Sequence, residues 1–242
     1  MKYWKITVMK NAGRNLVCAH RGMTRLFYNV VGRFYDVLYH RLINGYVDSA
    51  TTLMDDLIED GDIVLDVGCG TGLLSHLAAP RAANVVGVDL SIGMLQKAQN
   101  KNRRKYPLHF VNGDAMNLPL SRKFDCCVSA FMLVMLPREK RWRVIEEMAR
   151  LLKPGGRIAF LSSRPQFGKQ WMSGEEWKEG LQRLGFQRVV ITESGDVFLN
   201  VVAIKPPVSE QKSPAKVEDA GWQLWGWDEA GAIPEPEPAF VS

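Results

Sequence analysis

Short apolar runs alternate with amphipathic stretches through the middle of the chain, from about residue 48 to residue 205. Runs rich in β-branched residues are typical of buried strands, whereas apolar residues at intervals of three and four indicate helices. The predicted strands cover residues 63–66, 84–89, 109–112, 124–129, 157–161, 187–192 and 197–204. The predicted helices cover residues 47–59, 71–79, a stretch that begins after Ser91, and residues 138–152 and 173–185.

Strands that alternate with helices predict an α/β fold with a parallel sheet. The last two strands are an exception, because a tight turn around Gly195 joins them directly and makes them antiparallel. The expected fold is therefore a Rossmann-like sheet of seven mostly parallel strands, with an antiparallel last strand and helices on both faces. Ser173 and Glu176 have the spacing of a capping box at the start of the last helix.

An acid and three alternate glycines follow the first predicted strand. Asp66 closes the apolar run, and Gly68, Gly70 and Gly72 lead into the next helix. Glycines let a ligand approach the backbone closely, and a helix N-terminus presents unpaired N–H groups. A dinucleotide fingerprint spaces its glycines as G-x-G-x-x-G, and an acid beside a pyrophosphate would be repelled. The pattern instead favours a cationic nucleotide such as S-adenosylmethionine, which has an ammonium and a sulfonium group.

Further polar side chains stand at the ends of the next three predicted strands. Asp89 ends the second strand, where a carboxylate can accept hydrogen bonds from both ribose hydroxyls. Asp114 follows the third strand, and Ser129 ends the fourth. Open α/β sheets bind ligands beyond the carboxyl ends of their strands. We therefore expect these side chains to meet Asp66 in one site.

The first 47 residues mix basic side chains with apolar and aromatic ones. Up to Tyr46 the chain has eight lysine and arginine residues and a single acid, Asp36. Apolar positions recur at helical spacing from Met23 to Ile43. Two interpretations stay open: a helical lid that packs on the catalytic domain, or a lid whose basic amphipathic surface also contacts anionic lipid.

The composition changes again from residue 206. Proline, tryptophan and acidic residues dominate the segment 206–242, which is expected to be extended or disordered, with tryptophans able to dock on the domain or on a partner. The expected organisation is a basic helical extension at 1–47, a ligand-binding domain at 48–205, and a tail at 206–242.

Composition narrows the class of protein further. A chain of 242 residues with 46 % hydrophobic content is long enough for one α/β domain with extensions. No apolar run approaches the roughly 20 residues that span a bilayer, and the start lacks a signal-peptide core, so a cytoplasmic location is expected. The four cysteines have no C-x-x-C spacing and the four histidines are scattered, so we expect neither disulfides nor a metal site.

Over residues 54–204 the chain resembles the class I S-adenosylmethionine-dependent methyltransferases. The matching motifs cover residues 64–72, 87–91 with Met94, 113–115, 124–125 and 151–156. The resemblance implies that S-adenosylmethionine is the cofactor and S-adenosylhomocysteine the product. It also implies that Asp66 binds the ammonium through water, Asp89 the ribose and Asp114 the adenine amine. The remaining cofactor-binding positions implied are Gly68, Cys69, Gly70, Thr71, Gly72, Leu90, Met94, Ala115 and Ser129, with Met94 and Ala115 at the adenine faces.

A second, shorter stretch at residues 28–39 resembles the entry region of the type 11 branch, which methylates quinone precursors and phospholipid amines. There, lid tyrosines reach the sulfonium and the substrate, so Tyr28 and Tyr35 are the candidate catalytic residues. The alternative for both tyrosines is packing inside the lid.

The acceptor is narrowed by what the sequence lacks. No Asn/Asp-Pro-Pro-aromatic motif and no Pro-Cys nucleophile follows the fourth strand, so no specific nucleic-acid partner is predicted. The apolar stretch 131–136 favours an apolar or lipid-like acceptor. A small-molecule or lipid methyltransferase is therefore the leading hypothesis. The alternatives are an RNA or protein methyltransferase guided by the basic segment, and a cofactor-binding regulatory protein without transfer activity.

Overall fold

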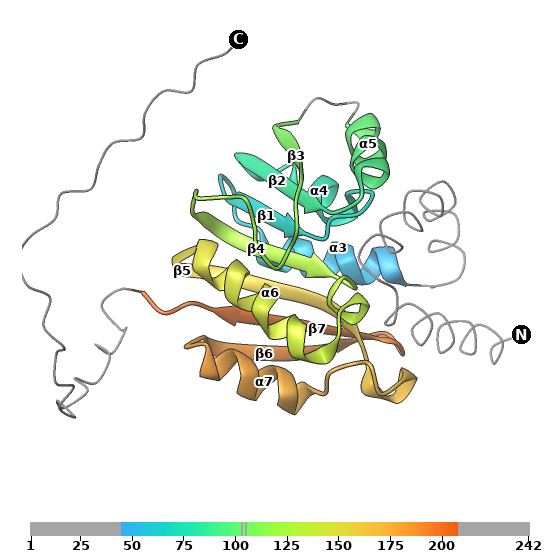
Figure 1. Ribbon diagram of the computed structural model, residues 1–242, viewed down its shortest axis with the longest axis vertical. Coiled ribbons are helices and arrows are strands. Elements are labelled where there is room, and N and C mark those ends of the chain that lie inside the picture. The colour runs from blue at the N-terminus through green and yellow to red at the C-terminus, as the bar shows by residue number, and fades with distance from the viewer. Residues whose placement is uncertain (1–44, 103, 105, 208–242) are drawn as a thin grey trace, which may run out of the picture. The chain divides into compact units, whose positions relative to one another are not determined.

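Seven strands form one sheet in the order β3-β2-β1-β4-β5-β7-β6 (Figure 1). The structure is a computed structural model that describes residues 45–102, 104 and 106–207. The strands are β1 (Ile63–Val67), β2 (Asn84–Asp89), β3 (Leu108–Asn112), β4 (Phe124–Ala130), β5 (Leu152–Ser163), β6 (Gln187–Ser194) and β7 (Phe198–Ile204). β1 to β5 pair in parallel, whereas β7 runs antiparallel to both β5 and β6. The predicted fold class is therefore confirmed.

Helices cover both faces of the sheet. The helices are α3 (Tyr46–Leu57), α4 (Leu73–Ala78), α5 (Ile92–Lys101), α6 (Arg138–Leu151) and α7 (Gly174–Arg183), with short 3₁₀ turns at η1 (Leu133–Met135) and η2 (Pro165–Phe167). The apolar sides of α3 and α4 share one buried cluster with one face of the strands. The apolar sides of α6 and α7 share a second cluster with the opposite face. In Figure 1, α6 and α7 lie in front of the sheet and α3 lies behind it.

This arrangement explains why the central strands read as continuous apolar runs. Successive side chains of a strand point to opposite faces, and here both faces are buried. Cys126 packs in the cluster under α3 and α4, whereas its neighbour Cys127 packs in the cluster under α6 and α7. Both thiols are fully buried, and burial raises their pKa values. They are core residues rather than a reactive pair.

The helix starts follow the predicted capping residues. Ser173 accepts a hydrogen bond from the Glu176 amide at 3.1 Å, and the Glu176 carboxylate accepts one from the Ser173 amide at 2.8 Å. Ser91 caps α5 by accepting from the Met94 amide at 3.3 Å. Gly185 follows α7 with a φ of 82°, in the left-handed region that commonly ends a helix.

Two local expectations were wrong. α6 ends at Leu151 and β5 begins at once with Leu152, five residues earlier than the predicted strand, because the buried Leu152 pairs with Phe124 across the sheet. The apolar spacing after Ser91 predicts that Ile92, Leu95 and Ala98 face the sheet, but Ile92 is 43 % exposed. The buried side of α5 consists of Met94, Leu95 and Ala98.

Several predictions lie on residues outside the described ranges. They are the extension up to residue 44 with its lid and lipid-contact interpretations, Tyr28 and Tyr35, and the tail from residue 208. Tyr46, which was assigned to the extension, begins α3, and Val47, where the predicted helix 47–59 starts, is its second residue. Within the described ranges, every helix is too short or too polar to cross a lipid bilayer.

Candidate functional site

Four side chains named from the sequence lie at or near the carboxyl ends of four neighbouring strands. Asp89 ends β2, Asp66 and Ser129 are the penultimate residues of β1 and β4, and Asp114 follows shortly after β3. Because these strands are adjacent and parallel, their ends lie along one edge of the sheet (Figure 1). The convergence predicted from strand order is therefore present in the fold.

Asp66 is almost completely buried, with 1 % of its surface exposed. Its Oδ2 atom accepts hydrogen bonds from the Ser75 hydroxyl at 2.6 Å and from the Ser75 amide at 3.0 Å. Burial raises the pKa of Asp66 from 3.8 to about 7, the Ser75 bonds oppose that rise, and the charge of Asp89 adds to it. Asp66 therefore ties β1 to the first turn of α4 and titrates close to neutral pH.

Asp89 holds the tips of the glycine loop and of α5 together. Its Oδ2 accepts from the Gly70 amide at 2.9 Å, and its Oδ1 accepts from the Ser91 amide at 2.8 Å. Burial raises the pKa of Asp89, although the two amides lower it. Leu90, the next residue, is an exposed large apolar side chain at 38 %. A carboxylate with fixed orientation therefore lies beside an apolar surface at the end of β2.

The three alternate glycines all have positive φ angles, 69° at Gly68, 54° at Gly70 and 81° at Gly72. Residues with a Cβ rarely adopt these angles. A Cβ on Gly68 would lie only 2.2 Å from the Cγ atom of Met132, so this glycine lets Met132 pack directly on the loop. A Cβ on Gly70 would meet no atom within 4 Å. The loop is thus packed at its start and open at its middle.

One hydrogen bond and one pKa shift describe the surroundings of Cys69 and Thr71 in the loop. Lys101 at the end of α5 donates to the Thr71 carbonyl at 3.2 Å. Burial raises the pKa of the Cys69 thiol, and the charges of Asp66 and Asp89 raise it further. Cys69 is therefore a neutral thiol in the wall of the loop, not a nucleophile.

Ser129 is buried, and its hydroxyl donates to the Val67 carbonyl at 2.7 Å. It therefore joins the ends of β1 and β4. Met94 is also buried, at the first turn of α5. Asp114 accepts a hydrogen bond from the Met116 amide at 3.0 Å, and Ala115 between them is half-buried. The turn that contains Asp114 thus has a defined shape.

The segment after β4 begins with a strained residue. Phe131 has a φ of 55°, in the left-handed region that is a genuine outlier for a bulky side chain. Its ring makes edge contacts with Tyr46, Trp171 and Phe198, with centroids 5.3 to 5.9 Å apart. Strain of this kind concentrates at functional sites. The next residue is Met132, so the aromatic cluster adjoins the glycine loop.

Neither histidine in the described ranges is placed to act as a base at this edge. The His76 Nε2 atom donates to the Ala98 carbonyl at 3.0 Å, and burial lowers the pKa of His76. His109 is an exposed residue of β3. In the part of the chain that the structure describes, no three histidine, cysteine, aspartate or glutamate residues gather as metal ligands would.

Residues 64–156 match a family described as a methyltransferase domain. This part of the chain is a methyltransferase domain of the class I, S-adenosylmethionine-dependent kind. The sheet order and the antiparallel β7 are those of this class. The match begins in β1 and ends in β5, so it includes all four strand ends that carry the candidate site residues.

Relatives and solved structures with similar sequences or folds are consistent with this assignment. A demethylmenaquinone methyltransferase of Paenarthrobacter aurescens is 36 % identical over 129 residues, which cover 51 % of this chain and 48 % of that protein. A ubiquinone biosynthesis O-methyltransferase of Dechloromonas aromatica is 34 % identical over 130 residues, or 52 % of each chain. This chain therefore spans about half the length of each of these relatives.

The fold matches a magnesium protoporphyrin IX methyltransferase from Synechocystis PCC 6803, solved with bound S-adenosylmethionine. The TM-score is 0.61 and the identity 22 %, over 78 % of this chain and 99 % of that one. At this identity the likeness establishes the fold alone.

Sequence reasoning missed several residues that contact the candidate site or the loop beside it. Ser75 and Met132 contact it through Asp66 and Gly68. Glu147 and Arg150 on α6 bind the chain that follows Asp114. A hydroxyl in the first turn after an acid-ended strand was a readable signal for Ser75. The other three had none, because their partners are distant in the sequence.

Proposed function

We propose that this methyltransferase transfers a methyl group from S-adenosylmethionine to a small apolar acceptor of the quinone-precursor or phospholipid-amine kind. The single observation that supports S-adenosylmethionine as the donor is the geometry of Asp89. Its two oxygens are oriented by the amides of Gly70 and Ser91, directly beside the open middle of the glycine loop. A carboxylate in this position suits the two hydroxyls of a ribose.

The residues present fit the whole donor. Gly70 leaves space beside an acid, which suits the methionine end of a cationic nucleotide rather than a pyrophosphate. Asp66 would hold the ammonium through water and Asp89 the ribose. Asp114 would accept from the adenine amine, with Ala115 and Met94 at the faces of the ring. Ser129 and Leu90 would complete the walls.

The bound donor supplies a methyl group that its sulfonium activates. The chain's own residues have to align the acceptor and exclude water. Gly68 and Met132 form a tight contact at the start of the loop, and the apolar segment 131–136 follows β4. A neutral amine needs no base, whereas a quinol has to release a proton. His76 donates its Nε2 proton to a carbonyl and is not available for that task.

The acceptor half rests on the aromatic cluster and on the relatives. Phe131, Tyr46, Trp171 and Phe198 provide an apolar, ring-rich wall next to Met132. The two relatives described above act in quinone biosynthesis by their names. Tyr28 and Tyr35 stay proposals for the acceptor side, as does contact of residues 1–47 with anionic lipid.

Binding of S-adenosylhomocysteine, measured by titration calorimetry, tests the cofactor half. Asp89→Ala should weaken it about 10- to 100-fold, because charge-assisted hydrogen bonds to the ribose are lost. Asp125→Ala is the matched control. Asp125 also binds a backbone amide, that of Ile63, and a cation, Lys153, but at the opposite ends of the strands. Absence of binding by the unmodified protein, or equal affinity in Asp89→Ala, would refute the cofactor assignment.

Labelled S-adenosylmethionine tests the acceptor half. The protein is incubated in parallel with a short-chain quinol precursor, with vesicles of phosphatidylethanolamine, and with total RNA or protein extract. Label in the first or second sample supports the proposal, whereas label only in RNA or protein supports the macromolecular alternative. Tight cofactor binding with no label anywhere supports a regulatory role. Flotation with anionic vesicles, with and without residues 1–22, tests the lipid contact.

A further inference from the structure

The connection between β3 and β4 differs from its neighbours around the site. α4 joins β1 to β2, α5 joins β2 to β3, and α6 lies between β4 and β5, but in the described chain no helix lies between Asn112 and Phe124. Only one isolated bridge, from Asp114 to Asn117, gives this connection regular structure. A loop that contains a ligand-binding acid but lacks a helix needs other anchors to hold its shape.

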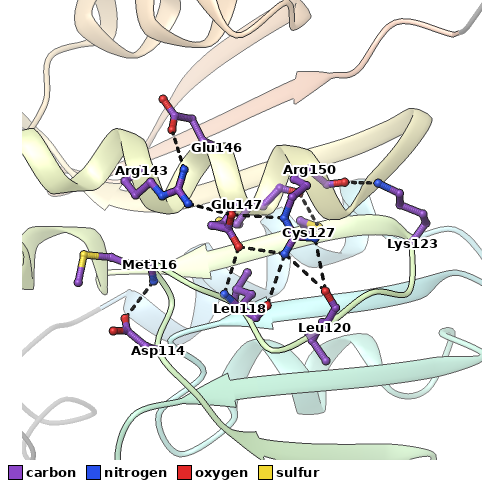
Figure 2. A network of polar contacts seen from close by, with 11 residues as sticks. Asp114, Met116, Leu118, Leu120, Lys123, Cys127, Arg143, Glu146, Glu147 and Arg150 are labelled. Atoms are coloured by element: carbon purple, nitrogen blue, oxygen red, sulfur yellow. Dashed lines mark hydrogen bonds and ion pairs between the residues drawn. The ribbon is translucent and has the colours of Figure 1, made fainter. Parts of the chain in front are cut away.

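Two residues of α6 supply those anchors (Figure 2). The Oε2 atom of Glu147 accepts a hydrogen bond from the Leu118 amide at 3.1 Å. The Arg150 guanidinium donates to the carbonyls of Leu118 and Leu120, both at 3.4 Å from Nη2. Lys123 closes the loop by donating to the Arg150 carbonyl. The backbone at Leu118 is therefore held through both its amide and its carbonyl.

The pair that provides these bonds is itself fixed. Glu147 is only 5 % exposed. Its carboxylate binds Arg150 at 2.9 Å and also pairs with Arg143 at 3.5 Å. The hydrogen bond from Arg150 holds the pKa of Glu147 below its usual range, and the Leu118 amide lowers it further. Burial of a charge costs free energy unless the charge is paired, and Glu147 is paired with two arginines. The chain therefore keeps a charged side chain at a position where an apolar side chain would be easier to bury.

The anchored point lies close to the acid of the site. Asp114 shapes the turn through the Met116 amide, and the isolated bridge joins Asp114 to Asn117, the residue before Leu118. The Leu118 side chain is buried in the cluster under α6. A shift of the backbone at Leu118 is therefore transmitted over a few residues to the Asp114 carboxylate.

We propose that Glu147 and Arg150 are positioning residues that set where the Asp114 carboxylate meets the adenine of the donor. The proposal rests on the proposed function, because it assumes that adenine binds at Asp114. It assigns a role in recognising the amine of the base to two α6 residues that bind the backbone of the loop. Loss of either residue should therefore affect adenine recognition more than it affects folding.

The test compares two ligands that differ only at the base. S-adenosylhomocysteine has the amine that Asp114 would accept from, whereas S-inosylhomocysteine has an oxygen there. The unmodified protein should prefer the first by about tenfold, the value of one hydrogen bond to a charged group. Glu147→Ala and Arg150→Ala should reduce that preference to about twofold and weaken S-adenosylhomocysteine by about five- to tenfold. Glu147→Gln retains an acceptor for the Leu118 amide and should restore part of the preference.

Two control variants separate positioning from general destabilisation. Glu146→Ala removes an exposed neighbour on the same helix, which pairs with Arg143 (Figure 2). Asp125→Ala breaks a comparable carboxylate anchor at the far ends of the strands. Both should keep the base preference, and Asp125→Ala should do so even where its melting temperature falls as much as that of Glu147→Ala.

The outcomes are distinct. A reduced base preference in Glu147→Ala or Arg150→Ala, with both controls unchanged, supports the proposal. Because the Arg150 side chain is 45 % exposed, Arg150→Ala provides the test even where Glu147→Ala does not fold. An unchanged preference in Arg150→Ala and in the folded Glu147 variants overturns it and leaves the cofactor assignment intact. No binding of either ligand by the unmodified protein overturns the cofactor assignment, and the positioning role with it.

Discussion

Replacement of Asp66 by asparagine should change how the stability of the protein depends on pH. Asparagine has nearly the same shape and can still accept from the Ser75 amide, but it does not ionise. Below pH 3.8 the Asp66 carboxyl is protonated in both the folded and the unfolded chain. As the pH rises toward 7 the unfolded chain loses this proton and the folded chain keeps it. The free energy of unfolding of the natural protein therefore falls relative to that of Asp66→Asn.

The size of this effect follows from the pKa. A rise from 3.8 to about 7 in a side chain that is 1 % exposed is about three pKa units. At 1.36 kcal/mol per unit, the penalty of the ionised form is about 4 kcal/mol. It should accumulate at about 1.4 kcal/mol per pH unit below pH 7 and level off above it. This penalty is between about a quarter and about four-fifths of the 5–15 kcal/mol typical of a domain.

Urea denaturation of both proteins from about pH 5 to about pH 8 measures the difference. Asp125→Asn is the matched control. Burial raises the pKa of Asp125, but hydrogen bonds from Lys153 and the Ile63 amide outweigh it and hold the pKa below the usual range. That carboxylate is ionised in both states over the whole interval, so its difference from the natural protein should be constant. Parallel curves for Asp66→Asn and the natural protein would refute the argument that burial dominates at Asp66.

The remaining predictions concern the loop, the donor and α7. A bound ammonium favours the ionised form of Asp66, so the affinity of the natural protein for S-adenosylhomocysteine should rise about tenfold from pH 6 to pH 8. In Asp66→Asn the affinity should not depend on pH over this interval. Titration calorimetry measures both affinities. Gly68→Ala would place a Cβ at a φ of 69° and against Met132, so it should lower the free energy of unfolding by about 2–4 kcal/mol. Gly70→Ala should lower it by only about 1–2 kcal/mol. Equal losses would contradict the packing argument. Ser173→Ala removes the α7 cap and should cost about 1 kcal/mol, with a correspondingly lower melting temperature.

Much of the fold was readable because its signals are local. The strand boundaries of β2 match the prediction residue for residue, and Ser91 and Ser173 cap the helices expected of them. A cap, a turn or an acid after an apolar run involves neighbours within a few residues, so its signal survives in the sequence. The strand-end site followed from the same signals once parallel strands were inferred.

Errors arose where packing across the sheet competed with a local signal. The Lys-Pro-Gly-Gly stretch at residues 153–156 indicates the end of a helix, and α6 does end before it. The same residues nevertheless join β5, because the Gly155 amide donates to the Lys205 carbonyl and Leu152 is buried opposite Phe124. Ile92 has the right polarity for the core but stands on the outer side of the first turn of α5.

The sequence by itself determined the class of fold, the glycine loop and the acids at the strand ends, because each depends on spacing along a short stretch. Only the tertiary structure decided what these groups contact. It placed Ser75 against Asp66, Met132 on Gly68, and the Glu147–Arg150 pair under the loop of Asp114. Such partners are separated by up to tens of residues, and their distance is set by how helices dock on the sheet. No periodicity in the chain encodes that docking.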